Sequence, residues 1–224
     1  MSQPLASDFF SSEHTDHHAL FENDPLVWEL LSEIKPYLQF RLQPENHGHV
    51  IGHPVIGEQV YIGEGTVIEP GVYIEGPAWI GKNCRIRHGA YLRENVITGD
   101  DCVLGNSCEF KNCLLLNGAQ VPHFSYIGDS ILGYQAHLGA GVICSNLRTD
   151  QKSVKVDWKG ERIDTGRRKF GAIIGDRVEV GCQAVLNPGT LLGPGSMVHP
   201  GAIVTGTLAE GAVAKNPNMI RMSD

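Results

Sequence analysis

Charged residues recur at intervals of eighteen in the middle of the chain, and this spacing suggests a site for an anion. Glu75, Arg93 and Lys111 are 18 residues apart, and Glu69 and Arg87 have the same separation. If residues 18 apart stack, two cations about 4.8 Å apart repel each other unless an anion or a carboxylate lies with them. Arg93 and Lys111 are therefore candidates for a phosphate site, and a plain surface ladder of ion pairs is the alternative.

Two groups of histidines also invite a chemical interpretation. His123 lies in the segment VPHFSYIGD close to Tyr126, where an imidazole could act as a general base. An ordinary surface histidine is the alternative. His47, His49 and His53 look like a metal cluster, but they lie at the start of the first repeat, far from the other polar groups. No CxxC pair accompanies them, so we expect no metal site.

A period of six residues identifies the elements that must position these side chains. From Ile56 onward the hexads read IGEQVY, IGEGTV, IEPGVY, IEGPAW, IGKNCR, IRHGAY, LRENVI, TGDDCV, LGNSCE, FKNCLL and LNGAQV, and the period returns at Ile174. An α-helix needs a period of 3.6 and an ordinary strand a period of 2. A sustained period of six predicts an all-β fold, a hexapeptide parallel β-helix.

Each hexad is expected to form a short strand and a corner, so that three hexads close a coil of 18 residues. The large first residue points inward, the small fifth residue fits the crowded interior, and glycine in second place permits the bend. The phase slips after Leu116, and the hexad count then predicts that Pro122 takes an inward place.

The remaining segments depart from this repeat. Asp24-Pro25 is expected to open a helix that ends or kinks at Pro36 and caps the open base of the coils. Residues 147–169 carry four lysines and four arginines, and SVKVDW and ERID flank a Lys159-Gly160 turn, which predicts an inserted hairpin. We expect its basic end to reach a cleft with a neighbouring subunit, and a solvated decoration is the alternative. The predicted division is a flexible tail over 1–23, a capping helix over 24–42, the β-helix over 43–207 and a C-terminal tail over 208–224.

Composition excludes several classes of protein. The chain has 224 residues and a formal net charge of −7, which argues against a general grip on nucleic acid. It contains no run of 18 apolar residues, so no membrane span is expected, and its start lacks the features of a signal peptide. A cytoplasmic location is predicted. Cys84 and Cys102 should stack, so a disulfide is geometrically conceivable, but a reducing compartment disfavours it.

The motifs CEFKN, PHFSYIGD, LGAG, CSN and RRKFGA occur in this order between residues 108 and 172. Over roughly residues 50–217 the chain resembles the acetyltransferase domain of the bifunctional N-acetylglucosamine-1-phosphate uridyltransferase/glucosamine-1-phosphate N-acetyltransferase family. It is still more similar to sugar-1-phosphate nucleotidyltransferase-like proteins that carry the hairpin insertion. The resemblance implies a left-handed coil, a homotrimer with sites between subunits, and transfer of an acetyl group from acetyl-CoA to the amine of an amino sugar phosphate.

The resemblance also implies roles for particular residues. His123 matches the base that accepts the amine proton, with Glu109 beside it and Asn146 near the amine and the thioester. The residues matching those that bind the sugar phosphate are Arg87, Lys111, Tyr126 and Lys169. The residues matching those that line the coenzyme A channel are Ala140, Cys182, Pro200 and Lys215, the last near its phosphates.

Three departures from the family leave alternatives open. No nucleotidyltransferase domain fits into residues 1–45, so a separate nucleotidyltransferase is a possible partner. His137 stands where the family has a sugar-binding asparagine, so the sugar is not fixed, and the basic hairpin replaces a shorter loop. A non-catalytic sugar-phosphate-binding or assembly module is therefore the alternative function. A γ-class carbonic anhydrase shares the fold, but no histidine closely follows His123 as its zinc site requires.

Overall fold

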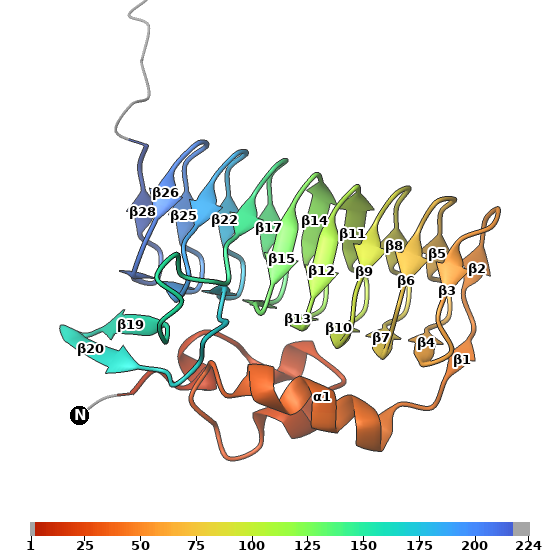
Figure 1. Cartoon of the computed structure of the whole chain (residues 1–224), viewed down its shortest axis with the longest axis horizontal. Coiled ribbons are helices and arrows are strands. Elements are labelled where there is room, and N and C mark those ends of the chain that lie inside the picture. The colour runs from red at the N-terminus through yellow and green to blue at the C-terminus, as the bar shows by residue number, and fades with distance from the viewer. Residues whose placement is uncertain (1–2, 217–224) are drawn as a thin grey trace, which may run out of the picture.

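The computed structural model describes residues 3–216 and is a left-handed parallel β-helix, as the hexads predict (Figure 1). Within this range the chain passes in turn through three parallel sheets of nine, nine and eight strands. Each coil contributes one strand to each sheet, except the last, which has strands in the first and second sheets alone. One α-helix, α1 (Leu30–Arg41), and one antiparallel hairpin lie outside the coils. The three sheets are called the first, second and third sheet below.

The strands are short, as expected for one side of a triangular coil. The first sheet contains β1 (Glu45–Asn46), β4 (Val60–Ile62), β7 (Ala78–Ile80), β10 (Val96–Thr98), β13 (Cys113–Leu115), β16 (Ile131–Leu132), β21 (Ala172–Ile174), β24 (Thr190–Leu192) and β27 (Thr207–Leu208). The second contains β2 (His49–Val50), β5 (Val67–Ile68), β8 (Arg85–Ile86), β11 (Val103–Asn106), β14 (Gln120–His123), β17 (His137–Leu138), β22 (Glu179–Val180), β25 (Met197–Val198) and β28 (Val213–Ala214). The third contains β3 (Val55–Ile56), β6 (Tyr73–Ile74), β9 (Tyr91–Leu92), β12 (Glu109–Lys111), β15 (Tyr126–Gly128), β18 (Ile143–Cys144), β23 (Val185–Leu186) and β26 (Ile203–Val204).

The core is built from the first and fifth places of the hexads. Large first-place residues such as Ile68 and Leu104 are fully buried, and so are small fifth-place residues such as Thr66, Ala78 and Cys102. Stacking of identical places covers this apolar surface coil by coil, which contributes about 25 cal/mol for each Å² removed from water. All six cysteines are free thiols, so no Cys84–Cys102 disulfide is present.

Two successive coils in the middle of the solenoid have 17 residues in place of 18, and this corrects the position predicted for Pro122. The register is 18 residues from β4 to β10, but β13 pairs with β10 at a separation of 17, with Cys113 opposite Val96. The next strand of the first sheet, β16, again pairs at a separation of 17, with Ile131 opposite Leu114. Val121 therefore takes the inward place opposite Leu104 and is fully buried, while Pro122 is half-buried at the corner. One residue is lost before Cys113 and a second before Ile131, and each loss shifts the later inward places by one.

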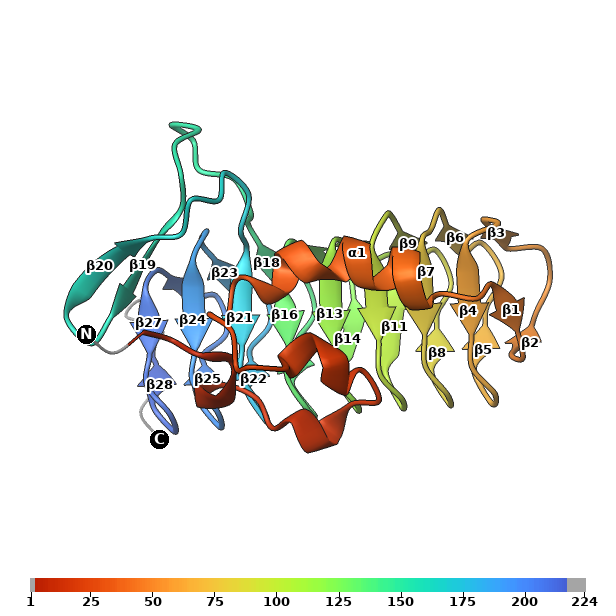
Figure 2. The same cartoon turned by 90° about the horizontal axis from the view of Figure 1, so that it is seen from below.

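The N-terminal segment covers the outer face of the first sheet, where a flexible tail was predicted for residues 1–23. Three 3-10 turns, η1 (Ala6–Asp8), η2 (Ser12–His14) and η3 (His18–Phe21), run beneath that face together with α1 (Figure 2). Phe9 is buried there with Leu114. The segment is held because outward places of the first sheet carry apolar side chains that would otherwise face water.

The helix also differs from its prediction in its bounds and its place. Asp24 is not its N-cap: the Asp24 carboxylate accepts hydrogen bonds from the amide and hydroxyl of Ser7 at 2.8 and 2.6 Å, and α1 begins six residues later. The helix continues through Pro36 to Arg41. It lies along the flank of the coils and does not close their base, because its buried residues Leu31 and Ile34 pack in the same cluster as the outer face of the first sheet (Figure 2).

The inserted hairpin is formed as predicted, by β19 (Lys155–Trp158) and β20 (Glu161–Asp164). Lys159 and Gly160 both have positive φ, 48° and 86°, as a two-residue type I′ turn requires. The hairpin packs on its own chain: Trp158 lies 5.6 Å from the Phe9 ring, and Thr207 donates a hydrogen bond to the Asp157 carbonyl. The buried face of its strands is thus held by the N-terminal segment, and contact of its basic end with a neighbouring subunit stays a prediction.

The solenoid continues past the predicted end at residue 207. Strands β27 and β28 extend the first and second sheets to Ala214, within the segment predicted as a tail, and residues 217–224 of that tail lie outside the described part. Over residues 3–216, no helix has the length and apolar character needed to cross a membrane.

Candidate functional site

Asp129 is the centre of a polar cluster at the corner where the third sheet meets the first. Its carboxylate is only 4% exposed and accepts hydrogen bonds from Lys111 Nζ at 3.2 and 3.3 Å, from Asn112 Nδ2 at 2.9 Å and from Asn146 Nδ2 at 2.6 Å. A buried carboxylate is stable only with such donors. This group is called the Asp129 corner below.

The short register explains why these residues meet. Lys111 ends β12 and Asn112 follows it, Gly128 ends β15 and Asp129 follows it, and the two strands pair with Lys111 opposite Gly128. Asn112 and Asp129 both turn the chain with positive φ, 47° and 45°, which asparagine and aspartate tolerate better than most residues. One coil further along, Asn146 reaches back over this corner.

Tyr126 extends the cluster onto the outer face of the third sheet. Its hydroxyl accepts a hydrogen bond from Asn146 Nδ2 at 3.2 Å. Burial raises the Tyr126 pKa, and the nearby carboxylates of Asp129 and Glu109 add to this, so the phenol is neutral near pH 7. Tyr126 lies opposite Glu109 in the register, and Glu109 accepts a hydrogen bond from Arg93 at 3.1 Å.

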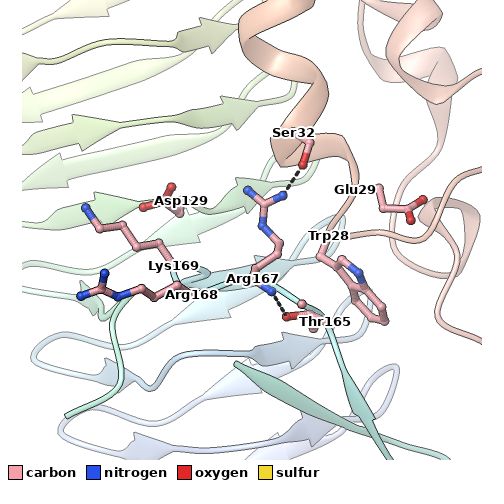
Figure 3. A pocket seen from close by; sticks show the side chains of 9 residues that line it. Trp28, Glu29, Ser32, Asp129, Thr165, Arg167, Arg168 and Lys169 are labelled. Atoms are coloured by element: carbon pink, nitrogen blue, oxygen red, sulfur yellow. Dashed lines mark hydrogen bonds between the residues drawn. The ribbon is translucent and has the colours of Figure 1, made fainter. Parts of the chain in front are cut away.

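Lys169 reaches the same corner from the base of the insertion. It forms an antiparallel bridge with Leu147, and the next residue, Phe170, is fully buried and donates its amide to the Asn146 carbonyl at 2.9 Å. Lys169 and Asp129 line one cavity of about 640 Å³, together with Trp28, Glu29, Ser32, Thr165, Gly166, Arg167 and Arg168 (Figure 3). The structure thus brings Lys111, Tyr126, Asn146 and Lys169 together within one chain.

A second line of predicted residues lies at another corner of the coils, where the strands of the second sheet end and those of the third sheet begin. His123 stacks on Asn106, and its carbonyl accepts the amide of Gly141 at 3.0 Å. Above it in successive coils come Ala140, Cys182 and Pro200, linked by amides of the next coil that donate to the Ala140 and Cys182 carbonyls at 2.8 Å. Lys215, beside Asn216, ends the line. This line is called the His123 corner.

The His123 corner offers an imidazole and a backbone donor. The His123 side chain is exposed, and over residues 3–216 it has no hydrogen-bond partner. Gly139 and Gly141 donate their amides to the carbonyls of Val180 and His123, whereas the Ala140 amide has no protein acceptor in the described part of the chain. A free imidazole and a free amide next to each other could respectively accept a proton and stabilise an oxyanion.

Three predicted residues lie away from their expected partners. Arg87 is at the corner between the second and third sheets, because its amide bonds to Leu104 at the end of the second-sheet strand, so it does not join Lys111. His137 is on the outer face of the second sheet and contacts the Glu179 carboxylate at 2.9 Å. Glu109 contacts Arg93 instead of His123.

Sequence reasoning missed Asp129 and undervalued Arg93. The 18-residue spacing pointed to Arg93. Its guanidinium forms ion pairs with Glu94 at 3.6 Å and with Glu109 at 3.1 Å, and Glu109 is the residue opposite Tyr126 in the register. Asp129 gave the same signal, because it lies 18 residues after Lys111 and so continues the column of Glu75, Arg93 and Lys111. Among residues 3–216 no group of three or more His, Cys, Asp and Glu could hold a metal ion, and His47 contacts Glu45 at 3.1 Å.

Comparisons with known proteins agree with this architecture. Residues 74–159 match the family model of the GMPPB C-terminal domain. The bifunctional sugar-1-phosphate nucleotidylyltransferase/acetyltransferase of Sulfurisphaera tokodaii is 38% identical over 162 residues, 72% of this chain and 40% of that protein. The bifunctional protein GlmU of Methanococcus aeolicus is 39% identical over 72% of this chain and 39% of its own length. The chain therefore spans about two fifths of these relatives.

A further relative matches along nearly its whole length. The uncharacterized acetyltransferase YaiX of Escherichia coli K12 is 36% identical over 208 residues, 91% of this chain and 90% of that protein. Among solved structures, LpxA from Acinetobacter baumannii aligns with 78% of this chain and 69% of its own at 16% identity, with a TM-score of 0.40, which carries no functional argument. On the sequence matches, the chain belongs to the hexapeptide-repeat acetyltransferase family that includes the β-helix of the sugar-1-phosphate nucleotidylyltransferase/acetyltransferases.

Proposed function

We propose that this protein transfers an acyl group, most simply acetyl from acetyl-CoA, to the amine of an amino sugar phosphate. The observation that carries the proposal is the pair of corners flanking the outer face of the third sheet. One corner gathers cations and amide donors around Asp129, and the other aligns a free imidazole with small residues over several coils. Membership of the acetyltransferase family supports the same conclusion.

The Asp129 corner suits the phosphate of the acceptor. Lys111 and Lys169 supply positive charge, and the Tyr126 hydroxyl and Asn146 amide supply neutral hydrogen-bonding groups. Asp129 holds Lys111 and Asn146 in place, so little side-chain entropy remains to be lost when an anion binds. Fixing the phosphate in this way would fix the position of the amine on the same sugar.

The His123 corner suits the thioester. Ala140, Cys182 and Pro200 are small or compact residues in successive coils about 4.8 Å apart, so their line could accommodate an extended chain such as that of coenzyme A. Lys215 at the end of the line would meet its phosphates. The acyl carbonyl would then lie beside His123, within reach of the Ala140 amide.

The proposed step is direct transfer. The neutral amine attacks the thioester carbonyl carbon, a C–N bond forms, and the oxyanion accepts the Ala140 N–H. His123 takes the proton from nitrogen, the C–S bond breaks, and the proton passes to the leaving thiolate. The nearby cations favour the neutral amine over the ammonium form, and the neutral amine is the form that attacks the thioester.

A homotrimer is part of the proposal. The N-terminal segment and α1 cover the first sheet, so only the second and third sheets are free to meet another copy (Figure 2). Their outer faces carry His137 and Glu109, which are apart within one chain. Contact between the second sheet of one copy and the third sheet of the next would bring such residues towards one site. Light scattering coupled to size-exclusion chromatography measures the stoichiometry, and a monomer would contradict this part.

The test is release of free thiol from acetyl-CoA in the presence of glucosamine 1-phosphate. Replacing His123 by alanine is expected to lower kcat by about 100-fold or more, as loss of a general base does. His88→Ala is the matched control, because His88 lies two coils away at the same corner and its ring contacts the Pro70 carbonyl at 2.7 Å. Equal rates in the two variants would refute the role of His123. Binding of coenzyme A and sugar phosphate without turnover would identify a non-catalytic module.

A further inference from the structure

Arg167 is a partly buried cation whose hydrogen-bonding capacity is not used. Its Nη1 donates to the Ser32 hydroxyl of α1, but its Nε is buried and has no partner in the described part of the chain. Burial lowers the Arg167 pKa, and only the negative charge of Asp129 opposes this. A guanidinium in such a place is stabilised by an anion that accepts from its free N–H groups.

The surroundings of Arg167 are cationic. Arg167, Arg168 and Lys169 line the cavity, and within residues 3–216 none of the three has a carboxylate oxygen within 4.0 Å. The two carboxylates of the lining do not balance them: Asp129 already accepts from Lys111, and Glu29 is exposed and lies beyond Trp28 (Figure 3). The cavity therefore has an excess of positive charge close to the Asp129 corner.

The Arg167 backbone is held rigidly. Its carbonyl accepts the Val154 amide at 2.7 Å and its amide donates to the Thr165 hydroxyl at 3.2 Å, while Thr165 itself donates twice to the Val154 carbonyl. Val154 is fully buried. These bonds fix the backbone of Arg167 at the wall of the cavity, and the Ser32 hydroxyl holds one end of its guanidinium.

We propose that this cavity is a second anion subsite, in which Arg167 and Arg168 bind a phosphoryl group adjoining the one held by Lys111 and Lys169, so that the ligand is a diphosphate. The inference rests on the proposed function only in taking that diphosphate to belong to the acyl acceptor. One phosphate could satisfy the Asp129 corner, but it would leave the Arg167 guanidinium with the Ser32 hydroxyl as its one acceptor in the described part of the chain. Two linked phosphoryl groups in one cavity of about 640 Å³ would reach both sets of donors.

Binding is tested by calorimetry on the full chain without acetyl-CoA, with inorganic phosphate, inorganic pyrophosphate and UDP as separate probes. We expect pyrophosphate to bind at least tenfold more tightly than phosphate, and Arg167→Gln to remove this difference. Arg167→Lys keeps the charge and is expected to retain part of it. Arg162→Gln is the matched control, because Arg162 is a 65% exposed arginine of the same hairpin that lies outside the cavity and is 3.8 Å from Asp157. Circular dichroism establishes that each variant is folded.

The outcomes decide the proposal. Equal affinity for phosphate and pyrophosphate in the unaltered protein overturns it, and so does an unchanged pyrophosphate affinity in Arg167→Gln. UDP binding with the same dependence on Arg167 identifies a nucleoside diphosphate as the source of the diphosphate, whereas pyrophosphate binding alone identifies a diphosphate without a nucleoside. Because these measurements need no turnover, pyrophosphate binding that depends on Arg167 in a protein without acyl transfer would reject the proposed function and leave the subsite intact.

Discussion

Replacing Asp129 by asparagine should destabilise the protein by about 2–3 kcal/mol, because it leaves Lys111 as a nearly buried charge without its counter-ion. The two side chains are 4% and 14% exposed, and the ions are 3.2 Å apart. Breaking such a pair from one side costs about 3–5 kcal/mol. We expect the smaller loss of about 2–3 kcal/mol for two reasons. The asparagine oxygen can still accept one hydrogen bond, and Glu94 lies 4.0 Å from Lys111.

The assay is equilibrium unfolding in urea with a control for the chemical change itself. Asp101→Asn makes the same substitution at an exposed corner where φ is 58°, close to the 45° of Asp129, so that backbone effects of the two substitutions match. We expect the control to change the free energy of unfolding by less than about 0.5 kcal/mol. The double variant Lys111→Met/Asp129→Asn removes both charges and should recover more than half of the loss. A single variant as stable as the control, or a double variant less stable than the single, would refute the reasoning.

Three further predictions concern the parts that cover the coils. Burial lowers the His17 pKa from 6.5 to about 4, so between those pH values only the unfolded chain binds this proton. The free energy of unfolding should therefore fall by about 3 kcal/mol as the pH drops through that range. Urea titrations of His17→Gln should lack this loss, whereas those of the exposed His18→Gln should keep it. Asp176→Asn should lower the free energy of local opening of the N-terminal segment by about 1–2 kcal/mol, because the buried Asp176 carboxylate accepts a hydrogen bond from the Ser11 amide at 3.0 Å. Faster hydrogen exchange confined to that segment would reveal this change. Gly160→Ala should cost about 1 kcal/mol in the hairpin alone, since φ there is 86° while the added methyl group has open space; a loss of protection throughout the coils would contradict this.

The repeat could be predicted from the sequence because each hexad carries its own information. A large first residue and a small fifth residue recur often enough that one exception, Thr98, does not obscure the pattern, and Thr98 is itself buried. The residue lost before Cys113 could not be located in the same way, because LLL at 114–116 offers an inward residue in either register. Pro122 was misjudged for this reason.

The N-terminal segment was misjudged because it has no period of its own. Its burial depends on the outer face of the first sheet, where Trp79, Ile97, Leu114 and Ile131 stand at outward places one coil apart. Apolar residues at successive outward places were a readable signal of a covered face, but not a sufficient one. The outward places of the third sheet carry apolar residues that are exposed in this chain, namely Val55, Tyr73, Ile143 and Ile203. What covers the first sheet could not be read, because isolated aromatic residues such as Phe9 in a polar segment fit many arrangements.

The cover of the first sheet also determines where the N-terminal segment can contribute to a site. The third sheet has two edges, and only the Asp129 corner adjoins the covered first sheet, so Ser32 of α1 can reach a ligand there and not at the His123 corner (Figures 2 and 3). The His123 corner lies between two uncovered sheets and stays open along several coils. A strand of three residues such as β15 spans about 10 Å. In the proposed reaction, a phosphate bound at the covered edge would leave the rest of its sugar directed across the strand towards the open edge, where a long thioester could bind without displacing the cover.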